Sequence, residues 1–188
     1  MSFIAEINNY IPKNEQEAQD KKIIIDCIQM FPHNILLRDN ALAHITSSGF
    51  ILNQTLDKAL FVHHNIRNTW AWTGGHADGN PNLLEVATQE ATEETGISVT
   101  PISKNIASID ILSAPGHIKN GKYINSHLHL SIAYLFVANE DEPVTIKHDE
   151  NSGVEWLSIS KIECGCLFTD RDVYLYKKLI EQANMWLA

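Results

Sequence analysis

The sequence predicts an α/β sandwich with a mixed β-sheet, and three features of the chain lead to that fold class. Segments with helical periodicity alternate with β-rich segments along 188 residues. No repeat or low-complexity tract interrupts this order. The run from Leu128 to Val137 is nearly apolar throughout, as a central strand covered on both faces should be. We therefore expect one domain over residues 1–188.

The N-terminal part predicts one helix followed by a hairpin. Residues 14–30 are polar at first and then apolar at helical spacing, and Pro32 ends the helix. The runs AHITSSGFILN (43–53) and KALFVHHN (58–65) are rich in β-forming residues. A turn between them, from Asn53 to Lys58, makes them a predicted β-hairpin.

A glycine pair, Gly74-Gly75, begins the segment that predicts the central helix. Asn82 has the position of an N-cap, and Glu85 is placed to reach back to it as in a capping box. The helix should run from Leu83 to about Thr95 and stop at Gly96. Its predicted buried stripe consists of Leu84, Ala87 and Ala91.

The C-terminal part predicts three further strands, a lid and a closing helix. The predicted strands are Ile106–Leu112, Leu128–Val137 and Val154–Leu157. Between the first two, the polar loop APGHIKNGKYINS (114–126) has the character of a surface lid. The helix should span Arg171–Leu187, with one side formed by Val173, Tyr176, Ile180 and Leu187.

Composition limits the classes of function. The formal charge of −9 and the lack of a basic stripe exclude a nucleic acid polymer as partner, although a small phosphorylated substrate fits if a metal supplies positive charge. No apolar run is long enough for a membrane helix, and the first ten residues lack the pattern of a secretory leader. Three cysteines, Cys27, Cys164 and Cys166, are too few for a disulfide framework or a zinc site. We expect a cytoplasmic protein. The sequence leaves the oligomeric state undecided, with a homodimer as one alternative.

Three carboxylates fall on one face of the central helix. Glu90, Glu93 and Glu94 stand at spacings i, i+3 and i+4. Each like-charged pair on an exposed helix is destabilising by roughly 0.2–0.5 kcal/mol unless a positive group lies against it. A divalent cation is the candidate for that group. The alternative is an ordinary solvated acidic face.

The segment from Gly75 to Ile97 resembles the Nudix box, the loop-helix-loop signature of the Nudix hydrolases. The resemblance is carried by Gly75 and by EATEETGI (90–97) at the family's spacing. Gln89 stands where the family has Arg, and Pro81 where it has Glu. These two side chains support the box in the family more than they bind metal, so we expect metal binding to be retained.

The resemblance extends over most of the chain. The sequence GGHADG before the box, and Glu150 six residues before Trp156, are similar to a Nudix subgroup with a GGHxDG motif. This likeness implies a Nudix-type α/β/α sandwich.

The resemblance also implies residue roles. Glu90 and Glu94 would be direct ligands of Mg²⁺, or of Mn²⁺, with the carbonyl of Gly74 completing the site and Glu93 acting as a third ligand or through water. Glu93 and Glu150 are the candidates for the general base. Glu150 could equally be an exposed acid of its loop.

Other side chains leave alternatives open. His127 and His129 point to the same side of a strand, where they either contact substrate or form hydrogen bonds in the core; a transition-metal site would need at least a third ligand. His63 and His64 alternate in direction, so at most one faces a cleft. Aromatic residues that could stack on a base or simply fill the core are Trp70, Trp72 and Tyr123. In the approach to the box, His76 and Asp78 could come near the metal or only form a turn.

The function that this likeness implies is a Mg²⁺-dependent pyrophosphohydrolase. It would cleave a diphosphate linkage in a small nucleoside diphosphate derivative or a related compound. One alternative is a Nudix-fold nucleotide-sugar sensor that does not hydrolyse its ligand, favoured by the missing Arg at position 89. A second is an isomerase of isoprenoid diphosphates, for which the sequence offers no dedicated acid–base cysteine.

Overall fold

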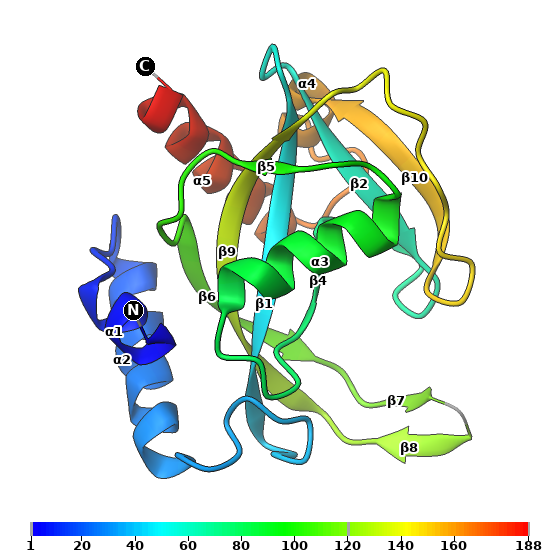
Figure 1. Cartoon of the computed structure of the whole chain (residues 1–188). Coiled ribbons are helices and arrows are strands. Elements are labelled where there is room, and N and C mark those ends of the chain that lie inside the picture. The colour runs from blue at the N-terminus through cyan, green and yellow to red at the C-terminus, as the bar shows by residue number, and fades with distance from the viewer. Residues whose placement is uncertain (1, 120, 188) are drawn as a thin grey trace.

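The computed structural model describes residues 2–119 and 121–187 and has helices on both sides of one sheet (Figure 1). The helices are α1 (Phe3–Asn9), α2 (Glu15–Met30), α3 (Leu83–Thr95), α4 (Ile159–Glu163) and α5 (Asp170–Leu187). The strands are β1 (Ala43–Asn53), β2 (Lys58–His64), β3 (Thr69–Ala71), β4 (Thr73–His76), β5 (Thr100–Pro101), β6 (Ser108–Ala114), β7 (His117–Lys119), β8 (Lys122–Ile124), β9 (His127–Ala138) and β10 (Asn151–Ser158).

The sheet is mixed, as predicted. Its main path runs β10-β2-β1-β9-β5, with β3, β4 and β6 pairing β2, β1 and β9 respectively. The pair β1 and β9 is parallel over its whole length, from Ala43 opposite Leu128 to Asn53 opposite Ala138, whereas the other pairs are antiparallel. The long parallel pair forms the centre of the sheet.

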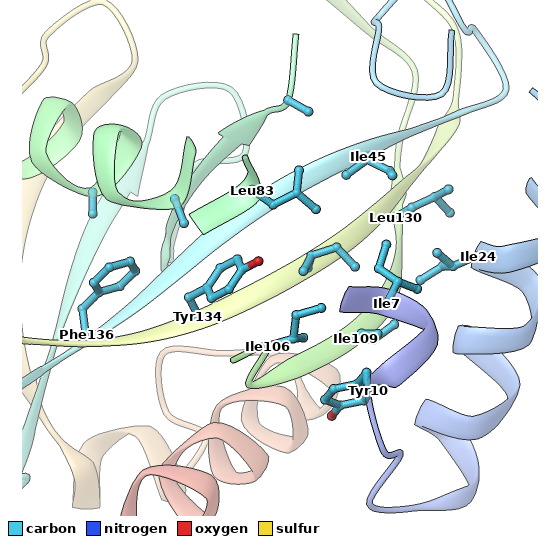
Figure 2. Close-up of a cluster of buried hydrophobic side chains, with 14 of the residues drawn as sticks. Ile7, Tyr10, Ile24, Ile45, Leu83, Ile106, Ile109, Leu130, Tyr134 and Phe136 are labelled. Atoms are coloured by element: carbon cyan, nitrogen blue, oxygen red, sulfur yellow. The ribbon is translucent and has the colours of Figure 1, made fainter. Parts of the chain in front are cut away.

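The side chains of β9 alternate between two buried clusters, which explains its nearly apolar sequence. One cluster packs under α1, α2 and α3, and Figure 2 shows part of it, with Tyr134 and Phe136 of β9 on the side of the sheet that α3 covers. The other cluster lies under α4 and α5 and includes Ala133 and Leu135 of the same strand. The predicted α/β/α sandwich is therefore confirmed.

Several predicted elements agree with the structure. The helix α2, the hairpin β1–β2 and the helix α3 begin and end within one residue of their predicted bounds. The strands β6 and β9 and the helix α5 also form, with ends shifted by at most two residues. Within the described residues, no helix is both long and apolar enough to cross a membrane.

Other predictions were wrong or incomplete. The segment predicted as a lid loop is instead a β-hairpin, β7–β8, which projects from the body of the sheet (Figure 1). The short elements α1, α4, β3 and β4 were missed, because three to seven residues carry too little periodicity to be recognised. In α5, Leu187 is exposed and Val173 is only partly buried, so the buried stripe is shorter than predicted.

Candidate functional site

A cleft of about 1020 Å³ lies where β1, β4 and β9 meet the β7–β8 hairpin and the start of α5. The three aromatic residues left unassigned from sequence all line it, namely Trp70, Trp72 and Tyr123. Pockets of this size accommodate ligands such as nucleotides and cofactors.

The helix α3 is capped at both ends by local hydrogen bonds and brings Glu94 to this cleft. The side chain of Asn82 accepts a hydrogen bond from the backbone N–H of Glu85 at 3.3 Å, as a predicted N-cap should. The reciprocal half of the capping box does not form, because the N–H of Asn82 donates to the side chain of Asn80 at 2.9 Å. At the other end, Gly96 has φ +77° and donates to the carbonyl of Thr92.

Glu94 lies inside the core face of α3 and not beside it. Its spacing of three and seven residues from Ala91 and Ala87 puts it on the buried stripe, and only 4% of the residue is exposed. Its Oε2 accepts a hydrogen bond of 3.0 Å from the backbone N–H of Gly74. Burial, together with the neighbouring carboxylates of Glu90 and Glu150, raises the pKa of Glu94 to about 8, and the hydrogen bond from Gly74 opposes this rise. Glu94 also lines the cleft.

The carboxylate of Glu90 packs directly over the glycine pair. A Cβ at Gly75 would lie 2.1 Å from Oε1 of Glu90, so this approach requires glycine at position 75. Burial raises the pKa of Glu90, although the ammonium group of Lys147 acts in the opposite direction. The structure thus brings Glu90 and Glu94 to adjacent glycines of the strand β4.

Lys147 provides the positive charge that crowded carboxylates need. Its Nζ lies 3.0 Å from Oε2 of Glu150 and 3.5 Å from Oε2 of Glu93. Glu93 also accepts a hydrogen bond of 2.7 Å from the side chain of Gln89, which is the main cause of its lowered pKa. Lys147 was not predicted from sequence, although its position three residues before Glu150 was a signal.

Four histidines from three strands meet at one end of the same cleft. They are His44 on β1, His76 on β4, and His127 and His129 on β9, and their ring nitrogens lie within 4.8 Å of one another. Nε2 of His127 and Nε2 of His129 are 3.0 Å apart. Across residues 2–119 and 121–187, no other set of three or more His, Cys, Asp or Glu side chains gathers its ligand atoms so closely, the box acids included.

Strand pairing brings these histidines together. His44 stands opposite His129 in the parallel register of β1 and β9, and His76 stands opposite Thr46, two residues further along β1. Burial and the surrounding histidines lower the pKa of His129 to about 2, and burial lowers that of His44. The sequence singles out the pair on β9 and, separately, His76 near the box, but neither His44 nor the cluster is predicted, because both depend on long-range pairing.

Other conspicuous residues have simpler surroundings. Asp78 has a positive φ and forms two hydrogen bonds of 2.7 Å with Arg38, which supports its turn-forming role. His64 lines the cleft, while His63 forms a hydrogen bond with Ser152. The two cysteines near α4, Cys164 and Cys166, are free and exposed.

Comparison with known proteins gives one family and several structural neighbours. The family described as NUDIX domain matches residues 43–179. A hydrolase of the NUDIX family from Clostridium perfringens is similar in structure, with a TM-score of 0.52 and 19% identity over 73% of this chain and 96% of the other. A MutT protein from Methanosarcina mazei Go1 gives 0.50 and 21%, over 77% and 94%.

An Ap4A hydrolase from C. elegans has a TM-score of 0.50 and 17% identity, over 77% of this chain and 98% of the other. No match was found among curated proteins. At these identities the structural neighbours establish a shared fold, and the sequence match covers the strands, the glycine pair and the helix that form the cleft.

Proposed function

Since the chain belongs to the NUDIX domain family, we propose that it is a metal-dependent hydrolase that cleaves a diphosphate linkage in a small nucleoside diphosphate derivative or a related compound. The observation that carries this proposal is the buried carboxyl group of Glu94, which lines the cleft and lies within a group of acids. A carboxyl group that is so poorly solvated needs either a proton or a cation.

The acids fit a hard divalent cation. Glu90 and Glu94 would hold Mg²⁺ or Mn²⁺, with the carbonyl of Gly74 and with Glu93 as the further ligands, because such cations prefer oxygen ligands. When bound, the cation neutralises charge on the phosphoryl groups of a diphosphate. The hydrogen bond from the N–H of Gly74 keeps the Glu94 carboxylate beside the glycine pair.

Hydrolysis also requires a base that takes a proton from the attacking water. The water oxygen bonds to phosphorus, the bridging P–O bond breaks, and the released phosphate carries away the bridging oxygen. Glu93 and Glu150 both lie beside Lys147, at 3.5 and 3.0 Å from its Nζ, and both are candidates for this base. Comparing Glu93→Gln with Glu150→Gln distinguishes them, since the base variant loses kcat and flattens the acidic limb of the pH profile.

The rest of the cleft supports a nucleoside-containing substrate. Trp70, Trp72 and Tyr123 line it. Tyr123 is exposed and is suited to stacking on a base, whereas Trp72 is buried in the core cluster under α5. Arg67 and Arg171 line the same cleft and carry charge that suits a phosphate. His127 and His129 remain candidates for substrate contact.

A second candidate function is a sensor that binds a nucleotide sugar without hydrolysing it. The observation that favours it is the ion pairing of Lys147 with both candidate bases, together with a neutral Gln89 where the family has Arg. The two functions make different predictions for the same ligand.

A panel of nucleoside diphosphate derivatives, tested with Mg²⁺, separates them. Product formation is followed by chromatography, and binding to each compound is followed by calorimetry. A hydrolase converts at least one compound in a Mg²⁺-dependent reaction. A sensor binds one tightly and leaves it intact, which would contradict the proposal.

A further inference from the structure

The four histidines of the cleft have the arrangement of a ligand set for a transition metal. In a tetrahedral zinc site, ligand nitrogens ~2.0–2.1 Å from the ion lie ~3.3 Å from one another. The ring nitrogens of His44, His76, His127 and His129 are already within 4.8 Å, and the closest pair is 3.0 Å apart. Small side-chain rotations would therefore complete the set.

Backbone carbonyls fix the orientation of two of these rings. Nδ1 of His44 lies 3.0 Å from the carbonyl oxygen of Asn40, and Nδ1 of His127 lies 2.8 Å from that of Asn125. A carbonyl oxygen only accepts, so each Nδ1 carries a proton, which leaves the lone pair of the neutral ring on Nε2. Metal-binding histidines use this outer hydrogen bond to hold the ring in place.

The buried nitrogen of His44 points to a missing partner. His44 is 3% exposed, and its Nε2 has no hydrogen-bond partner. Its ring centroid lies 4.8, 4.7 and 5.2 Å from those of His76, His127 and His129. Buried polar atoms without a partner are rare and need an explanation, such as an ion.

We propose that His44, His76, His127 and His129 bind one divalent transition-metal ion, with Zn²⁺ preferred. Four neutral imidazoles suit Zn²⁺ or Co²⁺ and are poor ligands for Mg²⁺, which prefers oxygen. This site is separate from the carboxylates of α3, and it rests on the histidines alone, not on the proposed hydrolase activity.

A metal at this position would link three strands at one end of the cleft. It would join β1, β4 and β9, and β4 also carries Gly74 and Gly75, which contact Glu94 and Glu90. The ion would thus fix the strand against which the acids pack. Its expected role is structural, because all four positions of a tetrahedral site would be filled by protein.

The test uses the full-length chain without a histidine tag, treated with chelator and then dialysed. Zn²⁺ binding is measured by calorimetry and metal content, and Co²⁺ binding by its visible absorption. We expect one ion per chain and the strong absorption of tetrahedral Co²⁺. Excess Mg²⁺ should not displace it.

Variants assign the site. His127→Asn and His76→Asn, both at partly exposed positions, should each lower the affinity for Zn²⁺ by more than ~10-fold. Loss of a group that only hydrogen-bonds to a ligand already costs about 10-fold, and loss of a ligand itself should cost more. Far-UV circular dichroism checks that each variant folds. The matched control is His33→Asn, an exposed histidine outside the cluster, and Glu94→Gln should also retain Zn²⁺ binding.

The proposal is overturned if the parent binds no Zn²⁺, or if Co²⁺ gives only the weak spectrum of an octahedral ion. Equal affinity in the parent and in a folded His127→Asn or His76→Asn variant also overturns it, since the ion would then lie elsewhere. In any of these cases the histidines form a hydrogen-bonded cluster only. Loss of Zn²⁺ binding in Glu94→Gln would overturn the separation of the two sites.

Discussion

Replacing Glu94 by glutamine should stabilise the metal-free protein while removing a predicted metal ligand. Glu94 is buried, and burial with two neighbouring carboxylates raises its pKa to about 8 from an ordinary value of 4.5. Between pH 4.5 and pH 8, the folded protein therefore keeps a proton on Glu94 that the unfolded chain has lost. The free energy of unfolding must then fall as pH rises from 4.5 to 8.

The size of the effect follows from the pKa difference. The ordinary pKa of 4.5 lies 2.5 pH units below pH 7, and each unit corresponds to 1.36 kcal/mol. At pH 7 the buried carboxyl group therefore lowers the free energy of unfolding by about 3 kcal/mol. Glutamine has nearly the same shape, stays neutral, and keeps an oxygen to accept the hydrogen bond from the N–H of Gly74. For a chain of this length, a gain of that size corresponds to a rise in melting temperature of up to about 6–12 °C.

The assay is thermal unfolding in the presence of chelator, from pH 5 to pH 8, for the parent and Glu94→Gln. We expect the two curves to approach each other at pH 5 and to separate as pH rises. Glu93→Gln is the matched control, because Glu93 is exposed and its pKa is lowered, so this change should give no stabilisation. Parallel curves, or a less stable Glu94→Gln at pH 8, would show that the carboxyl group is not kept protonated by burial.

Three further predictions concern the same group of acids. Millimolar Mg²⁺ or Mn²⁺ should raise the melting temperature of the parent, because the folded state alone offers the site; an unchanged melting temperature in calorimetry counts against the metal site. Lys147→Met should lower the stability of the metal-free protein by less than about 1 kcal/mol, since its ion pairs with Glu93 and Glu150 are partly exposed, and should tighten Mg²⁺ binding by calorimetry. Equal Mg²⁺ affinity would mean that Lys147 does not compete with the cation. The double change Gln89→Arg and Pro81→Glu should retain Mg²⁺-dependent hydrolysis, and complete loss of turnover would show that these two residues are functional in this chain.

The elements that could be predicted from sequence are those with enough residues to show a period. The helix α3 is 13 residues long and has a capping residue, a buried stripe and a terminating glycine. These signals predicted where it begins and where it ends. The strand β9 is long and covered on both faces, so its apolar run was unambiguous. Short elements such as α4, with five residues, carry no comparable signal.

The candidate site was only partly predictable, for a different reason. The spacing of Glu90, Glu93 and Glu94 is local, so the helix alone places them on one side. The burial of Glu94 depends on what packs against α3, and the position of Lys147 depends on a loop that follows β9. The cluster formed by the four histidines depends on the register of β1 against β9 and β4, which one sequence does not reveal.

The measurement that tests the hydrolase proposal most directly is the Mg²⁺-dependent rate at which the parent and Glu94→Gln hydrolyse a diphosphate-linked nucleoside compound. We expect turnover by the parent and a rate at least ~100-fold lower in the variant, since a lost metal ligand removes transition-state stabilisation worth several kcal/mol and each 1.36 kcal/mol is a factor of ten. The variant must be shown to be folded, which its expected higher melting temperature would do. Hydrolysis by Glu94→Gln at the parental rate would contradict the assignment of the metal site.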